Sequence, residues 1–177
     1  MQHTRVALQN RARLEAAGQP DHGWAEPLDV YQGICRDIID TLACTRASIW
    51  RFNLHADAIH CRCLYDQRGQ QFAPDTVLTA AGVPLYFEIM AKERLLVIPD
   101  YAQHPATRNL GAPYAQSSGI RALIDLLVVD EEGAPLAIIS AEQDRPRDWR
   151  EADILALYQI MDLATPLFRR LGRLPQA

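Results

Sequence analysis

The sequence lacks the features that identify membrane, secreted and zinc-binding proteins. No apolar run approaches the ~20 residues of a membrane-spanning helix. Residues 1–18 contain arginines where a signal peptide has a continuous apolar segment. The chain has four cysteines, and none forms the C-x-x-C pair that is typical of zinc sites. We therefore expect a cytoplasmic protein with free thiols, no metal site and no membrane partner.

A strong excess of charge of one sign is also absent. Eighteen Lys and Arg residues against 22 Asp and Glu residues give a net charge of −4, so nothing attracts the chain generally to nucleic acid. Hydrophobic residues make up 49% and charged residues 23% of the chain, as in ordinary globular proteins. Its 177 residues are sufficient for one domain with its own core. We expect one globular domain without a nucleic-acid partner.

Hydrophobic periodicity and turn residues predict an alternation of helices and strands. Residues 1–25 are expected to form a helical extension and residues 173–177 a short tail. The last helix is expected to begin with a capping box formed by Asp148 and Glu151. The order is typical of an α+β fold with an antiparallel sheet covered by helices. The predicted helices are residues 27–42, 84–93 and 148–171, and the predicted strands are residues 47–53, 58–66, 95–99, 122–129 and 136–141.

The second predicted strand carries two of the four cysteines. Because side chains alternate along a strand, Ile59, Cys61, Cys63 and Tyr65 are expected on one face. His60 points to the other face, which makes a metal site from these residues geometrically poor. We interpret the thiols as small side chains of the core.

The last predicted helix has more apolar surface than one stripe needs. One row of apolar residues can pack on the sheet. The other can pack either on the first helix or on the same helix of a second subunit. We predict a homodimer. The predicted interface consists of Leu157, Met161, Ala164, Phe168 and Leu171, and the neighbouring row contains Leu155, Ile160, Leu163 and Leu167.

An ordered series of short segments resembles a GAF domain. The segments are RASIWRF at 46–52, IHCRCLY at 59–65, YF at 86–87, VIPD at 97–100, HPATR at 104–108, GIRALID at 119–125 and RDW at 147–149. The resemblance covers residues 26–172 and is closest to the GAF modules that precede histidine kinase or diguanylate cyclase domains in bacterial signalling proteins. It implies a GAF/profilin-like sheet of five or six antiparallel strands in the order 2-1-5-4-3, with helices on both faces.

The resemblance also implies a cavity for a small ligand between the sheet and the irregular segment 100–118. Such sites are mostly apolar and contain a few placed polar groups. Aromatic side chains on the strands can belong to the core or stack on a planar ligand. The predicted ligand-binding residues are Trp50, Cys63, Tyr65, Asp100, Arg108, Tyr114, Asp125 and Glu142.

The three acidic residues of this set have a structural alternative. Asp100 can cap the turn that follows its strand. Asp125 and Glu142 can be strand-end residues that pair with Arg108 or Arg121. The sequence leaves both interpretations open.

The resemblance allows three ligand classes to be compared with the residues present. A covalent bilin is disfavoured, because the family's attachment cysteine lies four residues before the position of Tyr114, where this chain has Leu110. A cyclic nucleotide is disfavoured, because residues 144–151 match few members of the family's Asn-Lys, Phe and Asp-Glu signature. Free methionine-sulfoxide reductases of this fold use cysteines that flank the insert, where this chain has none. The ligand remains unknown.

The resemblance implies a non-catalytic sensory domain that signals through the packing of its terminal helices in a dimer. A histidine kinase or diguanylate cyclase is the implied output partner. A dimerisation scaffold without a ligand is the alternative hypothesis, and a thiol-based redox enzyme is a more remote one. No nucleophile-elbow, Walker or HExxH motif supports an enzyme.

Overall fold

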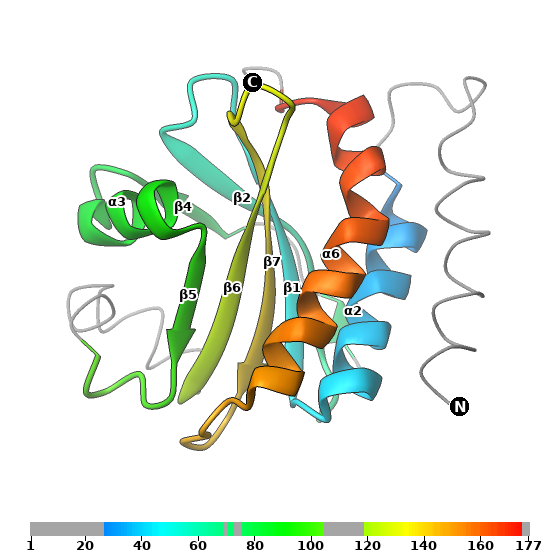
Figure 1. Cartoon of the computed structure of the whole chain (residues 1–177), viewed down its shortest axis with the longest axis vertical. Helices are drawn as coiled ribbons and strands as arrows, with labels where there is room; N and C mark the ends of the chain where they lie inside the picture. The colour runs from blue at the N-terminus through cyan, green and yellow to red at the C-terminus, as the bar shows by residue number, and fades with distance from the viewer. Residues whose placement is uncertain (1–26, 69–70, 73–75, 105–118, 175–177) are drawn as a thin grey trace.

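The computed structural model describes residues 27–68, 71–72, 76–104 and 119–174. Within these residues seven strands form one sheet, and helices α2 and α6 lie together on one of its faces (Figure 1). None of the helices in this part of the chain is both long and apolar enough to cross a bilayer. The elements are α2 (Leu28–Leu42), β1 (Arg46–Phe52), β2 (Ala58–Asp66), β3 (Gln71–Phe72), β4 (Val77–Thr79), α3 (Pro84–Glu93), β5 (Leu95–Ile98), β6 (Ala122–Val129), β7 (Pro135–Gln143) and α6 (Glu151–Leu171).

The strand order is β3-β2-β1-β7-β6-β5, and β4 also pairs with β2. All pairs are antiparallel. Without the short β3 and β4, this is the implied order 2-1-5-4-3, so the predicted α+β class and strand order are confirmed. The two short strands lie within residues 67–79, for which no strand is predicted because polar residues there favour a loop. Pairing with β2 overrides that weak local preference.

Helices α2 and α6 pack side by side over β1, β6 and β7, and the layer between them and the sheet is largely apolar (Figure 1). Tyr31 of α2 stacks on Phe168 of α6, with ring centroids 5.8 Å apart. Ala47 and Ile49 of β1 belong to the same core. Burial of these side chains is the main force that holds the helices on the sheet.

This packing corrects the predicted dimer interface. Leu157, Ala164 and Phe168 are fully buried in the core of a single chain, so no partner can reach them. Met161 and Leu171 are partly buried and pack against the same core. The sequence could not separate the two rows, because helical spacing is the same whether a row faces its own sheet or another subunit.

A β-bulge in β2 corrects the predicted face of the cysteines. Ile49 of β1 pairs with Cys63, and the next residue, Trp50, pairs with Cys61, so Arg62 is an extra residue on β2. One extra residue reverses the alternation of side chains. Cys63 therefore faces α2 and α6, and Cys61 faces the opposite side. The prediction that both lie on one face is wrong.

Helix α3 covers part of the opposite face of the sheet (Figure 1). Tyr86 and Met90 are its buried residues, and they join a second core cluster with Trp50 and Ile138 of the sheet. The prediction of helices on both faces is therefore confirmed.

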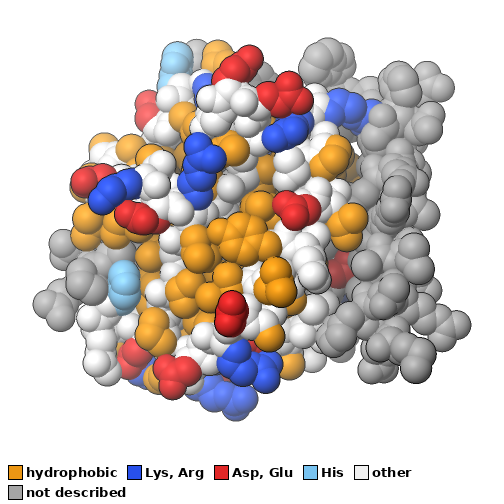
Figure 2. All heavy atoms as spheres, in the orientation of Figure 1, with side chains coloured by type: hydrophobic (Ala, Val, Ile, Leu, Met, Phe, Trp, Pro, Cys, Tyr) orange, Lys and Arg blue, Asp and Glu red, His pale blue; other side chains and the backbone are white. Residues whose placement is uncertain are grey.

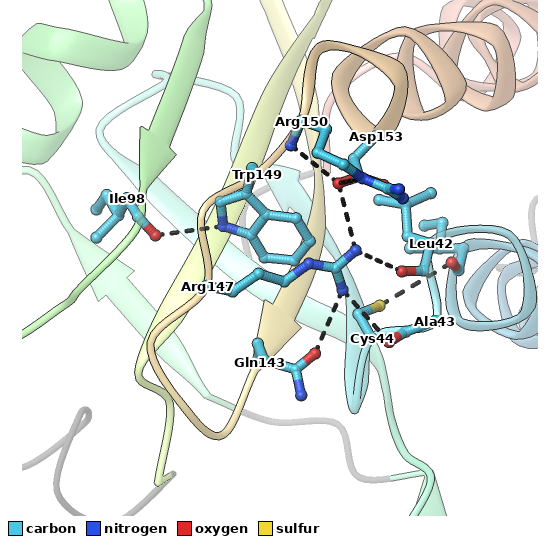
Figure 3. A network of polar contacts seen from close by, with 10 residues as sticks. Leu42, Ala43, Cys44, Ile98, Gln143, Arg147, Trp149, Arg150 and Asp153 are labelled. Atoms are coloured by element: carbon cyan, nitrogen blue, oxygen red, sulfur yellow. Dashed lines mark hydrogen bonds and ion pairs between the residues drawn. The ribbon is translucent and has the colours of Figure 1, made fainter.

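The loop between β7 and α6 ties three elements together (Figure 3). Arg147 Nη2 donates to the carbonyl oxygen of Leu42 at the end of α2 over 2.7 Å, which satisfies a carbonyl that has no helical partner. The indole nitrogen of Trp149 donates to the carbonyl oxygen of Ile98 over 3.3 Å. The Arg147 guanidinium lies over the Trp149 ring, 4.2 Å from its centroid. The RDW segment thus has a structural role.

The same loop places the start of α6 later in the chain than the predicted residue 148. The Trp149 contact holds the chain extended up to Arg150, and the helix begins at Glu151. Asp153 accepts a hydrogen bond from the Arg150 backbone nitrogen over 2.9 Å and forms an ion pair with Arg147 over 3.3 Å. The capping role predicted for Asp148 and Glu151 is therefore wrong, and Asp153 provides the carboxylate at the helix start.

Candidate ligand site on the α3 face

A row of buried polar side chains crosses three neighbouring strands on the α3 face. We call it the polar row. Arg46 pairs with Glu142 in the β1–β7 ladder, Ser48 pairs with Ser140, and Ser140 also pairs with Asp125 of β6. Directly paired residues project to the same face, so the five side chains are neighbours. None is more than 5% exposed.

The β1 end of the polar row is a connected set of contacts. Arg46 Nη2 lies 2.7 Å from Glu142 Oε2 in an ion pair. The Ser48 hydroxyl donates to Glu142 Oε1 over 3.0 Å, and the indole nitrogen of Trp50 donates to the Ser48 hydroxyl over 2.9 Å. A buried carboxylate is tolerated only with such partners. Trp50 and Glu142 are thus held in fixed orientations.

Asp125 lies at the β6 end of the row, beneath α3. The Tyr86 hydroxyl donates to Asp125 Oδ2 over 2.8 Å. Asp125 Oδ1 makes no hydrogen bond within the described part of the chain. Burial raises the pKa of Asp125 to about 7; hydrogen bonds from Ser140 and Tyr86 lower it, and the charge of Glu142 raises it. The carboxyl therefore changes protonation state near neutral pH.

Apolar and aromatic side chains surround the polar row. Trp50, Tyr86 and Tyr101 are each at most 5% exposed and belong to the α3-face cluster. Burial raises the pKa of the Tyr101 hydroxyl, and the charges of Asp125 and Glu142 raise it further. A few polar groups within a largely apolar surface is the composition of small-molecule sites. Among the described residues no group of three His, Cys, Asp or Glu side chains is arranged to hold a metal ion.

The structure brings together three of the eight predicted ligand-binding residues. Trp50, Asp125 and Glu142 lie on the α3 face. Arg108 and Tyr114 lie outside the described residues. Glu142 pairs with Arg46 and Asp125 with Tyr86, so the predicted pairing of these carboxylates with Arg121 is wrong.

Asp100 has the structural role offered as the alternative. It lies at the end of β5 and accepts hydrogen bonds from the Ala102 backbone nitrogen (3.2 Å) and the Gln103 side chain (2.9 Å). Arg121 lies 3.3 Å from the same carboxylate. These contacts close the turn after the strand.

Cys63 and Tyr65 lie on the other face of the sheet, away from the polar row. The Cys63 sulfur contacts Cys35 of α2 at 3.7 Å, and the Arg36 guanidinium lies 5.7 Å from the centre of the Tyr65 ring. The bulge at Arg62 is the reason, because it reverses the side-chain alternation beyond Cys61. Both are removed from the ligand site.

Sequence reasoning missed four members of the site: Arg46, Ser48, Tyr86 and Ser140. The sequence contained a signal for Arg46, Ser48 and Ser140. Polar residues interrupt three apolar strands at period-two positions, and the implied order makes those strands neighbours. Tyr86 gave no such signal, because helical spacing does not show which residue of α3 lies over a carboxylate of the sheet.

Comparisons with known proteins agree with this architecture. The GAF domain family model matches residues 26–165. The phycocyanobilin-bound GAF domain of a cyanobacterial phytochrome has a TM-score of 0.73 at 12% identity, covering 96% of this chain and 95% of that one. A domain of a two-component sensor histidine kinase protein from Sinorhizobium meliloti 1021 has a TM-score of 0.58 at 20% identity, covering 80% and 91% of the two chains.

A third similar structure is an enzyme. The free methionine-R-sulfoxide reductase from Neisseria meningitidis has a TM-score of 0.63 at 14% identity, covering 96% of this chain and 89% of that one. Identities this low show a shared fold and nothing more. No curated protein matches the chain. The family model nevertheless spans most of the sequence, so the chain belongs to the GAF domain family.

Proposed function

We propose that this domain is a non-catalytic sensory module that binds a small ligand on the α3 face. The polar row carries the proposal, because two carboxylates and a guanidinium are buried there among aromatic and aliphatic side chains. Apolar residues of similar volume at such positions often give an equally or more stable fold. A role in binding accounts for charges that stability alone does not require.

The charges of the polar row favour a ligand of a particular kind. When Asp125 is ionised, it and Glu142 oppose the single positive charge of Arg46. Asp125 Oδ1 accepts no hydrogen bond from the described residues, and so offers an acceptor in an apolar setting. A ligand that donates from a protonated amine, a guanidinium or a ring N–H group would complete the row.

A thermal-shift screen with nucleotides, tetrapyrroles, amino acids and amines tests the proposal. A ligand at 100 times its dissociation constant adds ~2.7 kcal/mol to the unfolding free energy. The Asp125→Asn variant removes the acidic acceptor, and we expect it to lose most of the shift. Ile39→Val changes a buried residue of α2 on the opposite face and should keep the full shift.

A flat response of the wild-type protein to every compound would contradict ligand binding. It would favour the dimerisation scaffold instead, with the polar row satisfied entirely within the chain. Equal shifts in the wild type and in Asp125→Asn would show that a ligand binds elsewhere.

We further propose that the domain signals as a homodimer through its terminal helices. With Leu157, Ala164 and Phe168 buried, the contact must use the outer surface of α6, where Leu155 is 57% exposed. Partly buried hydrophobic residues of β5 and α6 pack against the core, and Figure 2 shows an apolar patch in the region of these elements. A ligand can shift such a dimer only by binding its two arrangements with different affinity.

Light scattering tests the dimer. Leu155→Glu should lower the molar mass from that of a dimer to that of a monomer at tens of micromolar protein. Val77→Glu is a matched control, because Val77 is 47% exposed but lies on β4, remote from α6. A wild-type monomer, or a dimer unchanged by Leu155→Glu, would contradict this part of the proposal.

The output partner completes the proposed function. We propose a histidine kinase or diguanylate cyclase domain, supported by the likeness to the sensor histidine kinase domain. A cytoplasmic location follows from that role. Co-purification with the output domain and a ligand-dependent change in its kinase or cyclase rate would test the assignment.

A further inference from the structure

Two of the buried cysteines are neighbours in space. The Cys35 thiol on α2 donates to the sulfur of Cys63 on β2, and the two sulfur atoms are 3.7 Å apart. Both residues are at most 3% exposed. The other two cysteines have different surroundings: the Cys44 thiol donates to the Arg46 carbonyl oxygen over 3.3 Å, and Cys61 lies on the opposite face of the sheet.

The β-bulge at Arg62 creates this pair. Without the extra residue, Cys63 would share the face of Cys61 and point toward α3. With it, Cys63 points into the layer between the sheet and α2, where it meets Cys35. Bulges commonly redirect one side chain in this way.

Cys63 differs in acidity from the other three cysteines. Burial raises the pKa of both Cys44 and Cys61 to about 12. A hydrogen bond from Cys35 lowers the pKa of Cys63, burial acts against it, and the positive charge of Arg36 lowers it further. Burial and the Cys63 contact raise the pKa of Cys35. Cys63 is therefore the more acidic thiol of the pair and the one that ionises first.

We propose that Cys35 and Cys63 form an oxidation-sensitive thiol pair, which hydrogen peroxide or an organic hydroperoxide converts into an intramolecular disulfide between α2 and β2. The ionised Cys63 sulfur attacks the terminal peroxide oxygen, which breaks the O–O bond and gives a sulfenic acid together with hydroxide from hydrogen peroxide or an alkoxide from an organic hydroperoxide. The Cys35 sulfur then attacks the sulfenic sulfur, and the Cys35 proton leaves with the sulfenic oxygen as water. The two sulfurs lose two electrons and the peroxide gains them.

The geometry requires only a small movement. Sulfur atoms at 3.7 Å must approach by roughly 1.6 Å to reach the ~2.05 Å of a disulfide. The reaction joins residues 28 positions apart, so it constrains α2 against the sheet on the face where α2 packs on α6. This site is separate from the polar row, and its failure would leave the ligand proposal intact.

Peroxide treatment of the whole folded chain tests the pair. The reduced protein is exposed to hydrogen peroxide, quenched, denatured and alkylated, and its intact mass and peptides are measured. We expect two of the four thiols to escape alkylation, with one cross-linked peptide pair containing Cys35 and Cys63. Dithiothreitol should restore all four thiols.

Cysteine variants provide the controls. Cys44→Ala/Cys61→Ala should form the disulfide as the wild type does, whereas Cys63→Ala should not react. Cys35→Ala should stop at a sulfenic acid on Cys63 that dimedone traps. Four alkylated thiols after peroxide, oxidation of Cys44 or Cys61 as fast as Cys63, or a cross-link between two chains would each overturn the proposal. Peptide mapping of the wild type decides the question even if a single variant fails to fold.

Discussion

The two faces of the sheet use the same strands for different purposes. The face under α2 and α6 is filled by aliphatic and aromatic side chains, and the buried Arg51 donates to the Tyr31 hydroxyl over 3.0 Å and to the Gly172 carbonyl after α6. The face under α3 buries Arg46, Asp125 and Glu142 among its apolar residues.

This difference separates stability from binding. Apart from the proposed Cys35–Cys63 pair, the side chains of the α2/α6 face pack within the chain, so substitutions there should act on folding and leave ligand binding unchanged. The α3 face keeps charges that cost desolvation energy and leaves Asp125 Oδ1 without a hydrogen bond from the described residues. Functional sites commonly carry such a cost in stability. The faces should therefore respond differently to mutation and pH.

The largest effect is expected on the α2/α6 face. Phe168→Ala deletes a fully buried ring that stacks on Tyr31 and should lower the unfolding free energy by about 4 kcal/mol. Val77→Ala, at an exposed position on β4 outside the proposed dimer contact, should change it by less than about 0.5 kcal/mol. Urea denaturation checks both values. A small loss for Phe168→Ala would contradict the packing described for this face.

On the α3 face, removing one charge of the ion pair should lower the unfolding free energy more than removing both charges. Arg46→Met leaves Glu142 buried without its ion-pair partner and should lower the unfolding free energy by about 3 kcal/mol. Arg46→Met/Glu142→Leu removes both charges and should recover most of that loss while abolishing ligand binding. Denaturation and thermal-shift titration measure the two properties. A double variant as unstable as the single one would show that the ion pair itself stabilises the fold.

The next largest effect is a pH dependence of the unfolding free energy that arises from Asp125 on the α3 face. The pKa of Asp125 is about 7 in the folded protein and near 3.8 when unfolded, so the folded state binds the extra proton between these values. Its contribution is complete below pH 4 and is lost as pH rises through 7, a decrease of about 2 to 3 kcal/mol between pH 5 and pH 8. Asp125→Asn should lack this component. Parallel stability curves for the wild type and the variant would refute the assignment.

The smallest predicted effect concerns the Tyr86 hydroxyl, which donates a hydrogen bond to Asp125. Tyr86→Phe removes the 2.8 Å hydrogen bond to Oδ2 and should lower the unfolding free energy by about 1 kcal/mol. Because that bond lowers the pKa of Asp125, its removal should raise this pKa. Carboxyl chemical shifts from NMR titration report the change. An unchanged titration would show that Tyr86 does not control the protonation of Asp125.

The sequence predicts the fold better than the site because the two depend on different signals. Periodicity and turn residues place the main helices and strands, and the family resemblance supplies their order. A single inserted residue at Arg62 is invisible to a strict period of two, and it moved Cys63 and Tyr65 from the predicted site to the other face. The partners of Asp125 and Glu142 depend on strand register, which the sequence does not state.

The central claim is that the ligand binds to the α3 face through the polar row. A crystal structure of the protein with the compound that gives the largest thermal shift tests it most directly. We predict that the compound lies against β1, β6 and β7 beneath α3, with a donor within hydrogen-bond distance of Asp125 Oδ1. A compound bound against α2 and α6, or one that leaves Asp125 and Glu142 without a new contact, would contradict the claim.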